Sequence, residues 1–212
     1  AHNLDQGGRK VNKLITDAVS DLFSIKGVLY DLECLKLQSI AKESKHPIVN
    51  IGTYCGKSTA FLASGTKQKV YAIDLWDERP SGYVPDMFDT KRGYHLESTR
   101  REFLQNMQKY GLDNVIPVKG DSNVIGKTWK EPLGVLFIDG DHHYKQALND
   151  YELFSKHLVD GGYLAIHDIV IKAVKKLIDE VIIPSGLWVE FELVETLWIA
   201  RKADNGNERR TD

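Results

Sequence analysis

The sequence predicts an α/β domain with a mainly parallel seven-stranded sheet, an antiparallel last strand and helices on both faces. Two observations lead to this prediction. Five short apolar runs, rich in β-branched and aromatic residues, alternate with polar or amphipathic stretches, which is the pattern of a parallel sheet covered by helices. Near the end, two more strand-like runs follow one another too closely for a helical crossover, so we expect them to form an antiparallel pair. That ending is uncommon in nicotinamide-binding folds.

The first segment of the chain is predicted to be helical. Apolar residues recur near helical spacing between Val28 and Ala41, and Lys45-His46-Pro47 ends the pattern. We expect residues 1–44 to form an N-terminal helical segment that acts as a cap over the rest of the molecule or as a dimer contact.

The predicted sheet and its helices occupy most of the remaining chain. The parallel strands cover residues 48–51, 70–73, 115–118, 134–138 and 163–166, the clearest amphipathic helices cover 97–110 and 144–158, and the closing pair covers 188–193 and 195–200. We therefore expect residues 45–202 to form the main domain and residues 203–212 to form a polar, frayed tail.

Composition and charge limit the class of protein. The 212 residues are 42% hydrophobic and 27% charged, which suits one globular domain and excludes a disordered or fibrous chain. The 28 basic and 30 acidic residues give a net charge of −2, so no nucleic-acid partner is expected. No apolar run is long enough to cross a bilayer, no signal peptide is recognised, and Cys34 and Cys55 lack the spacing of a metal or redox motif. These features predict a cytoplasmic protein without a membrane contact.

Polar residues close all five predicted parallel strands. They are Gly52-Thr53-Tyr54-Cys55-Gly56-Lys57-Ser58-Thr59, Asp74, Gly120-Asp121-Ser122, Asp139-Gly140-Asp141-His142-His143 and His167-Asp168, in strand order. The carboxyl ends of parallel strands meet at one edge of a sheet, and ligands bind there. A structural interpretation exists for each motif alone, because Asp74, Asp121 or Ser122 can cap a helix and Gly52 and Gly56 can serve ordinary turns. Five polar strand ends on one edge favour a binding cleft.

Three ligands compete for this edge. A nucleoside triphosphate would use Gly56-Lys57-Ser58, but a phosphate loop needs four residues between its first glycine and that triplet, and Gly52 and Gly56 enclose only three. A dinucleotide would need a glycine where Tyr54 stands. S-adenosylmethionine has a ribose and an adenine but no phosphates. It fits best, because without a pyrophosphate to bind a side chain at position 54 is tolerable, and Asp74 lies 22 residues beyond Gly52, the separation at which a carboxylate holds ribose hydroxyls.

Four stretches carry a resemblance to a known family. They run from Asn50 to Thr59, from Ala72 to Trp76, from Phe137 to His142 and from Gly161 to Asp168, within a similarity that covers about residues 45–202. They resemble the class I S-adenosylmethionine-dependent methyltransferases, in particular the bacterial small O-methyltransferases that include sugar- and antibiotic-tailoring enzymes. The resemblance implies a Rossmann-like class I methyltransferase fold.

The resemblance also implies the cofactor-binding residues. The glycine loop would lie along the methionine part of S-adenosylmethionine, Asp74 would bind the ribose hydroxyls, and Asp121 or Ser122 would contact the adenine edge. The full set of candidates is Asn50, Gly52, Thr53, Tyr54, Ser58, Asp74, Leu75, Asp121, Ser122 and Asp139. Two positions depart from the family pattern, since many members have an acidic residue where Asn50 stands and a further glycine in the middle of the loop.

The chemistry implied by the resemblance is a direct displacement on the methyl group, with removal of a proton from an acceptor hydroxyl. Relatives often hold a divalent cation with aspartates at the ends of the fourth and fifth strands, so Asp139, Asp168 and the adjacent His167 are the candidate ligands for Mg²⁺ or another divalent cation. His142 matches a base position, which makes His142 and Asp139 the candidate catalytic residues, with His143 as the alternative base. Asp139 could instead contact the amino group of the cofactor without a metal.

The acceptor is predicted to be a small hydroxylated molecule such as a sugar or another natural product. Residues 76–95, which mix aromatic side chains with prolines and glycines, are predicted to form a lid over it; the alternative is a surface loop packed on the body. A homo-oligomer is compatible with the sequence. A nucleoside-binding module without catalysis, or a nucleotide hydrolase, remains the alternative function.

Overall fold

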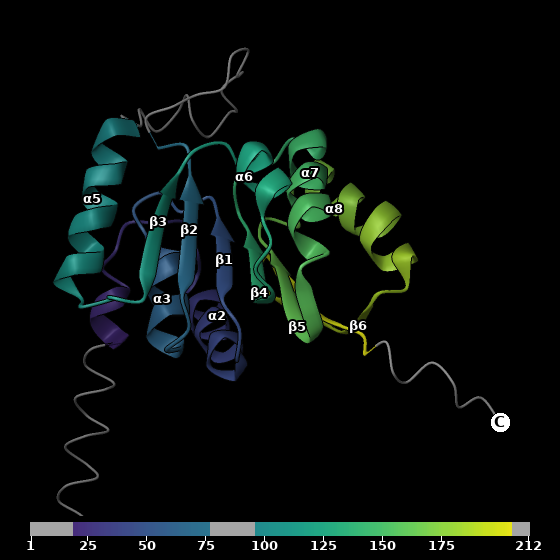
Figure 1. The fold of residues 1–212 in the computed structure, drawn as a ribbon, viewed down its shortest axis with the longest axis horizontal. Coiled ribbons are helices and arrows are strands. Elements are labelled where there is room, and N and C mark those ends of the chain that lie inside the picture. The colour runs from purple at the N-terminus through teal and green to yellow at the C-terminus, as the bar shows by residue number, and fades with distance from the viewer. Residues whose placement is uncertain (1–18, 77–95, 205–212) are drawn as a thin grey trace, which may run out of the picture.

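A computed structural model describes residues 19–76 and 96–204 of the chain and shows a single seven-stranded sheet (Figure 1). The strands are β1 (Ile48–Ile51), β2 (Val70–Asp74), β3 (Val115–Lys119), β4 (Leu133–Ile138), β5 (Leu158–Ile166), β6 (Trp188–Val194) and β7 (Leu197–Lys202). Their order across the sheet is β3-β2-β1-β4-β5-β7-β6. β1 to β5 pair in parallel, and β7 lies antiparallel between β5 and β6. The predicted mainly parallel sheet with an antiparallel last strand is confirmed.

Helices cover both faces of this sheet, as predicted. They are α2 (Asp31–Glu43), α3 (Lys57–Gly65), α5 (Leu96–Lys109), α6 (Ser122–Thr128), α7 (Tyr144–Ser155) and α8 (Lys172–Leu177), followed by a π-helical turn (Ile178–Ile182) and a 3₁₀ turn (Ile183–Ser185). Among the helices of the described residues, none combines the length and the apolar character that crossing a bilayer requires.

Two apolar cores lie on opposite faces of the sheet because successive strand residues point to opposite sides. In β4, Val135 and Phe137 pack into the core formed with α2, α3 and α5, whereas Leu136 and Ile138 pack into the core formed with α7 and α8. All residues of β1 and β4 are buried. This explains why the central strands are continuous apolar runs with almost no polar positions.

The helix α2 is part of the main core. Its side chains Cys34, Leu37, Ile40 and Ala41 are buried in the same cluster as residues of α3, β1 and β4. The N-terminal segment predicted over residues 1–44 therefore contributes packing to the sheet in its described part. A role of this segment as a dimer contact stays a prediction.

Some predicted boundaries are wrong. The last strand begins at Leu197 instead of residue 195, and the largest difference lies between α7 and β5. The amphipathic pattern predicted a helix over 144–158 and a strand from 163, but α7 ends at Ser155 and β5 begins at Leu158. The extra residues of β5 include Gly161, whose φ of +73° interrupts the regular strand, and the pairing with β4 shifts register between Leu133 and Val135. Because this irregular stretch contains two glycines, its sequence indicated a turn instead of a strand.

The order of the strands places the candidate site. β1 lies between β2 and β4, so the chain leaves β1 to one side of the sheet and later returns to its other side. Such a switch point opens a crevice at the carboxyl ends of the strands. Gly52 follows β1 and Asp139 follows β4, and the backbone N–H of Asp139 donates to the carbonyl of Ile51 at 2.8 Å.

Candidate active site

The loop after β1 is held by the carboxylate of Asp74. Its Oδ2 accepts the backbone N–H groups of Thr53 (2.7 Å) and Tyr54 (2.9 Å), and its Oδ1 accepts the N–H of Trp76 (2.7 Å). These bonds keep Tyr54 in a left-handed conformation, with φ of +48°. The sequence did not indicate this loop-holding role of Asp74. A carboxylate oxygen accepts about two hydrogen bonds. Within residues 19–76 and 96–204, Oδ1 accepts the N–H of Trp76, which leaves it capacity for one further donor.

Gly52 brings this loop against the end of β4. Its φ is +81°, and a Cβ atom built on Gly52 would lie 2.1 Å from the carbonyl oxygen of Asp139. Only glycine permits this approach. The predicted cofactor loop and the predicted catalytic aspartate are therefore in direct backbone contact.

Asn50 lies buried beneath the loop, inside the end of β1. Its Nδ2 donates to the hydroxyl oxygens of Ser58 (2.9 Å) and Thr59 (2.8 Å) at the start of α3. Among the described residues, none donates a hydrogen bond to its Oδ1. A buried acceptor without a donor is costly, and it is the kind of atom that a ligand completes. Leu75, the other predicted contact of this part, is half-buried just after β2.

Asp121 and Ser122, the predicted adenine contacts, begin α6. The carboxylate of Asp121 caps the helix by accepting the backbone N–H of Asn123 at 2.8 Å, as the structural interpretation predicted. The hydroxyl of Ser122 donates to the buried carboxylate of Asp150 at 2.6 Å. Because the Ser122 side chain is engaged inside the protein, its backbone is the part that remains for a ligand.

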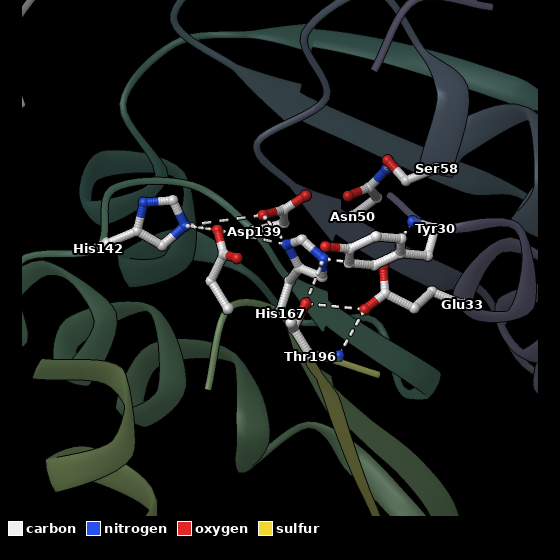
Figure 2. Close-up of polar contacts among 9 residues, drawn as sticks. Tyr30, Glu33, Asn50, Ser58, Asp139, His142, His167 and Thr196 are labelled. Atoms are coloured by element: carbon white, nitrogen blue, oxygen red, sulfur yellow. Dashed lines mark hydrogen bonds and ion pairs between the residues drawn. The ribbon is translucent and has the colours of Figure 1, made fainter. Parts of the chain in front are cut away.

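Asp139, His142 and Asp168 come together at the carboxyl ends of β4 and β5. The Nε2 atom of His142 lies 3.1 Å from Oδ2 of Asp168 and 3.8 Å from Oδ1 of Asp139, and Figure 2 shows His142 and Asp139 facing each other. Burial lowers the pKa of His142, but the two carboxylates outweigh it and raise that pKa to about 10. Burial raises the pKa of Asp168, but hydrogen bonds and charge from His142 and His167 outweigh burial and hold that pKa well below its usual range.

This group is the candidate cation site. One ligand atom from each of Asp139, His142 and Asp168 lies within 4.8 Å of the others. Two carboxylates and an imidazole suit a divalent cation with a preference for oxygen, such as Mg²⁺ or Mn²⁺. The sequence predicted Asp139 and Asp168 as ligands, but it proposed His142 only as a base. The predicted ligation of a metal by His167 stays a prediction.

His167 instead lies between two carboxylates. Its Nδ1 is 3.1 Å from Oδ1 of Asp139 and 3.5 Å from Oδ2 of Asp168. Its Nε2 is 3.0 Å from Oε2 of Glu33 and 3.1 Å from the hydroxyl oxygen of Thr196. Figure 2 shows the ring between Asp139 and Glu33. Burial lowers the pKa of His167, but these neighbours raise it well above its ordinary value. Glu33 was not among the predicted site residues. A Glu at the third position of a helix is a familiar capping signal, and nothing in its local sequence connected it with His167.

His143, the alternative base, points elsewhere. Its side chain is exposed, and its Nδ1 and backbone N–H both contact the carboxylate of Asp141. The structure thus places His142, and not His143, beside Asp139. The predicted lid over residues 76–95 lies outside the described residues, except for Trp76, whose indole Nε1 donates to the carbonyl of Tyr54 at 3.1 Å.

Comparisons with known proteins identify the family of this chain through a family model and support its fold through solved structures. The model of a family described as "Methyltransferase domain" matches residues 49–169. An uncharacterized protein, R132, of Acanthamoeba polyphaga mimivirus is 28% identical over 122 residues, which cover 57% of this chain and 50% of that protein, so the chain matches about half the length of this relative.

Two solved structures are similar over most of the chain. The O-methyltransferase NovP has a TM-score of 0.66 at 16% identity, covering 81% of this chain and 80% of that one. The O-methyltransferase from Bacillus cereus, solved in complex with SAH, has a TM-score of 0.62 at 14% identity, covering 90% and 91%. At these identities the two structures support the fold, and the fold is the one that the sequence predicted.

Proposed function

We propose that this chain, which belongs to the family of methyltransferase domains, transfers the methyl group of S-adenosylmethionine to a hydroxyl group of a small acceptor. Membership of the family makes the chain a methyltransferase. The hydroxyl acceptor is the finer part of the proposal, and a sugar or another hydroxylated natural product is the class we favour. The similar solved structures that are O-methyltransferases support this choice.

One observation carries the proposal. The backbone of Gly52 touches the carbonyl of Asp139, so the loop that would pass the cofactor and the carboxylate–imidazole group are adjacent. A displacement at a methyl group requires sulfur, methyl carbon and acceptor oxygen in line, with a proton acceptor beside the oxygen. The contact between Gly52 and Asp139 supports such an arrangement.

The residues at the loop fit the cofactor. The buried Oδ1 of Asn50 has the character needed to accept a hydrogen bond from the ammonium group, and Oδ1 of Asp74 has capacity for one ribose hydroxyl. The amide oxygen of Asn50 carries only a partial negative charge. We therefore expect it to bind the ammonium group less strongly than a carboxylate would.

His142 is the proposed base, and the carboxylates of Asp139 and Asp168 control its protonation. With both carboxylates beside it, the imidazole holds a proton at neutral pH, because its pKa is about 10. It can accept the proton of an acceptor only when these carboxylates are engaged by another positive charge. A divalent cation, if held by Asp139 and Asp168 with His142 left outside its ligands, would supply that charge and would polarise the acceptor hydroxyl.

The first test addresses the cofactor. Asn50→Ala should weaken binding of S-adenosylmethionine about tenfold, because a hydrogen bond to a charged group is lost. Binding of 5′-methylthioadenosine, which has no ammonium group, should change less than twofold. Isothermal titration calorimetry with both ligands measures this difference. An equal loss for both would mean that Asn50 only supports the loop.

The second test addresses catalysis. Turnover of labelled S-adenosylmethionine should appear with a member of a panel of sugars and phenols in the presence of Mg²⁺ or Mn²⁺, and His142→Ala should abolish most of it while leaving cofactor affinity unchanged. The nucleoside-binding module and the nucleotide hydrolase are not favoured by any observation at this site. Cofactor binding without turnover across the whole panel would count against the hydroxylated acceptor class.

A further inference from the structure

Glu33 is a fully buried carboxylate at the start of α2, with an exposed fraction of 0%. Its Oε1 accepts both the backbone N–H and the hydroxyl of Thr196, each at 2.8 Å, and its Oε2 accepts the backbone N–H of Tyr30 at 2.8 Å. The remaining partner is His167, whose Nε2 lies 3.0 Å from Oε2. Both oxygens are therefore satisfied, which is the condition under which a protein tolerates a buried charge.

Helix capping explains only one of these contacts. The bond to the N–H of Tyr30 closes the first turn of α2, and an exposed glutamate would serve equally well. The other contacts join three distant parts of the chain: α2, the turn between β6 and β7, and the end of β5. A carboxylate that is buried at such a junction has a task besides capping.

His167 connects Glu33 to Asp139, one of the proposed reactive residues. Each ring nitrogen of His167 faces a carboxylate oxygen: Nε2 faces Oε2 of Glu33, and Nδ1 faces Oδ1 of Asp139. With one nitrogen bonded to Glu33, the ring cannot turn, and its other nitrogen stays directed at Oδ1 of Asp139. The same Oδ1 lies 3.8 Å from Nε2 of His142.

We propose that Glu33 is a positioning residue of the methyl-transfer site, which acts through His167 to hold the carboxylate of Asp139 in the orientation that faces His142 (Figure 2). The proposal rests on the proposed function in one respect, the assignment of Asp139 and His142 to the reaction. If it is correct, α2 and the β6–β7 turn help to orient the reactive side chains. Hydrogen-bond partners behind the ligands of metal sites orient those ligands in the same way.

Nuclear magnetic resonance of the histidine ring nitrogens tests this proposal without an acceptor. In Glu33→Gln the side chain keeps its size, and its amide presents a donor to His167 where the carboxylate presented an acceptor. The ring signals of His167 should therefore change, and those of His142 should change with them, although Glu33 does not contact His142. Glu43→Gln is the matched control, since Glu43 is an exposed carboxylate of the same helix that accepts the Tyr163 hydroxyl at 2.6 Å. It should leave both rings unchanged.

A double-variant cycle shows whether His167 transmits the effect. In a His167→Asn background, Glu33→Gln should no longer alter the His142 signals. If Glu33→Gln does not fold, Thr196→Val provides a milder change: it removes the hydroxyl that donates to Glu33 and lies 3.1 Å from Nε2 of His167, and it keeps the backbone bond to Glu33. The ring signals of both histidines should then shift to a smaller extent. The proposal is overturned if the His142 signals stay at their wild-type positions in Glu33→Gln or Thr196→Val, or if they still respond without His167.

Kinetics provide the second readout once an acceptor is known. Glu33→Gln should lower kcat about ten- to a hundredfold, while the calorimetric affinity for S-adenosylmethionine stays within about twofold. Equal losses of kcat and cofactor affinity would indicate a general structural role and would overturn the proposal. If the wild-type protein shows no turnover, the proposed function fails, whereas the resonance experiment still decides whether Glu33 positions Asp139.

Discussion

Asp150 is a carboxylic acid on α7 that the packing encloses almost completely, with an exposed fraction of 1%. It accepts hydrogen bonds from the Ser122 hydroxyl at 2.6 Å and from Nε2 of Gln146 at 3.3 Å. Burial, and then the nearby carboxylates of Asp121 and Asp141, raise its pKa to about 7 against the weaker opposing effect of these hydrogen bonds. The residue that anchors Ser122 therefore changes charge near neutral pH.

The raised pKa of Asp150 predicts how the stability of the fold depends on pH. Between about pH 4 and pH 7 the folded state keeps a proton that the unfolded state releases, so the free energy of unfolding falls as the pH rises through this range. The loss is at most roughly 4 kcal/mol, from about 1.4 kcal/mol per pKa unit. Asp150→Asn cannot ionise and still accepts the Ser122 hydroxyl, so the variant should gain stability relative to wild type on going from pH 5 to pH 8.

Urea unfolding at both pH values measures the effect, and Asp113→Asn, at an exposed position, is the control. A difference between Asp150→Asn and wild type that is the same at pH 5 and pH 8 would contradict the assigned protonation of Asp150.

The turn between β1 and α3 shows how one element sets the geometry of another. Gly52 and Gly56 both have positive φ, and Gly52 also lies where a side chain would strike the backbone of Asp139. A Cβ at Gly56 would meet the side chains of Met107 and Phe103, which have more freedom to move. The contact between the loop after β1 and the end of β4 therefore depends on Gly52 more than on Gly56.

Gly52→Ala should be severely destabilising. Strain from a left-handed alanine costs about 1–2 kcal/mol, and the clash with the Asp139 carbonyl adds a backbone displacement, so the expected total is about 3 kcal/mol or more. Gly111→Ala isolates the strain, because Gly111 has a φ of +61° with nothing within 4 Å of its Cβ position. Thermal and urea unfolding of the two variants give the comparison. Equal losses of stability would mean that Gly52 does not hold the loop against β4.

The sequence predicted those elements whose signals are local. The apolar runs of β1 and β4 and the polar residues that end them are contiguous in the chain, and parallel topology then brings Gly52 and Asp139 to one edge. The boundary near Ser155 was missed because the glycines of β5 resemble a turn. Glu33 was missed because its partners His167 and Thr196 lie 134 and 163 residues away, and no spacing rule connects such positions.

At the scale of the whole molecule, the two cores differ in where their helices come from. The helices of the core with α7 and α8 all follow β1 in the chain, whereas the other core takes Leu22, Ile25 and Leu29 as well as α2 from the N-terminal segment. Phe61 and Phe137, both with an exposed fraction of 0%, belong to the core that includes α2. Residues 45–202 alone would therefore leave part of one face of the sheet, the part that α2 and residues 22–29 cover, without its packing partners.

Removal of residues 1–44 is expected to abolish cooperative folding. The truncated chain would expose the apolar side chains of the sheet and of α3 that pack against α2, so it should bind a hydrophobic dye and show no sharp thermal transition by circular dichroism. Two substitutions in α2 test the same idea in the full chain: Leu37→Ala, at a residue that is 0% exposed, should cost about 2–5 kcal/mol, and Leu35→Ala, at a residue that is 42% exposed, should cost under about 1 kcal/mol. A truncated chain that unfolds cooperatively and binds S-adenosylmethionine would show that the N-terminal segment is a separable cap. A loss of folding, together with a large cost for Leu37→Ala alone, would show that it completes the domain.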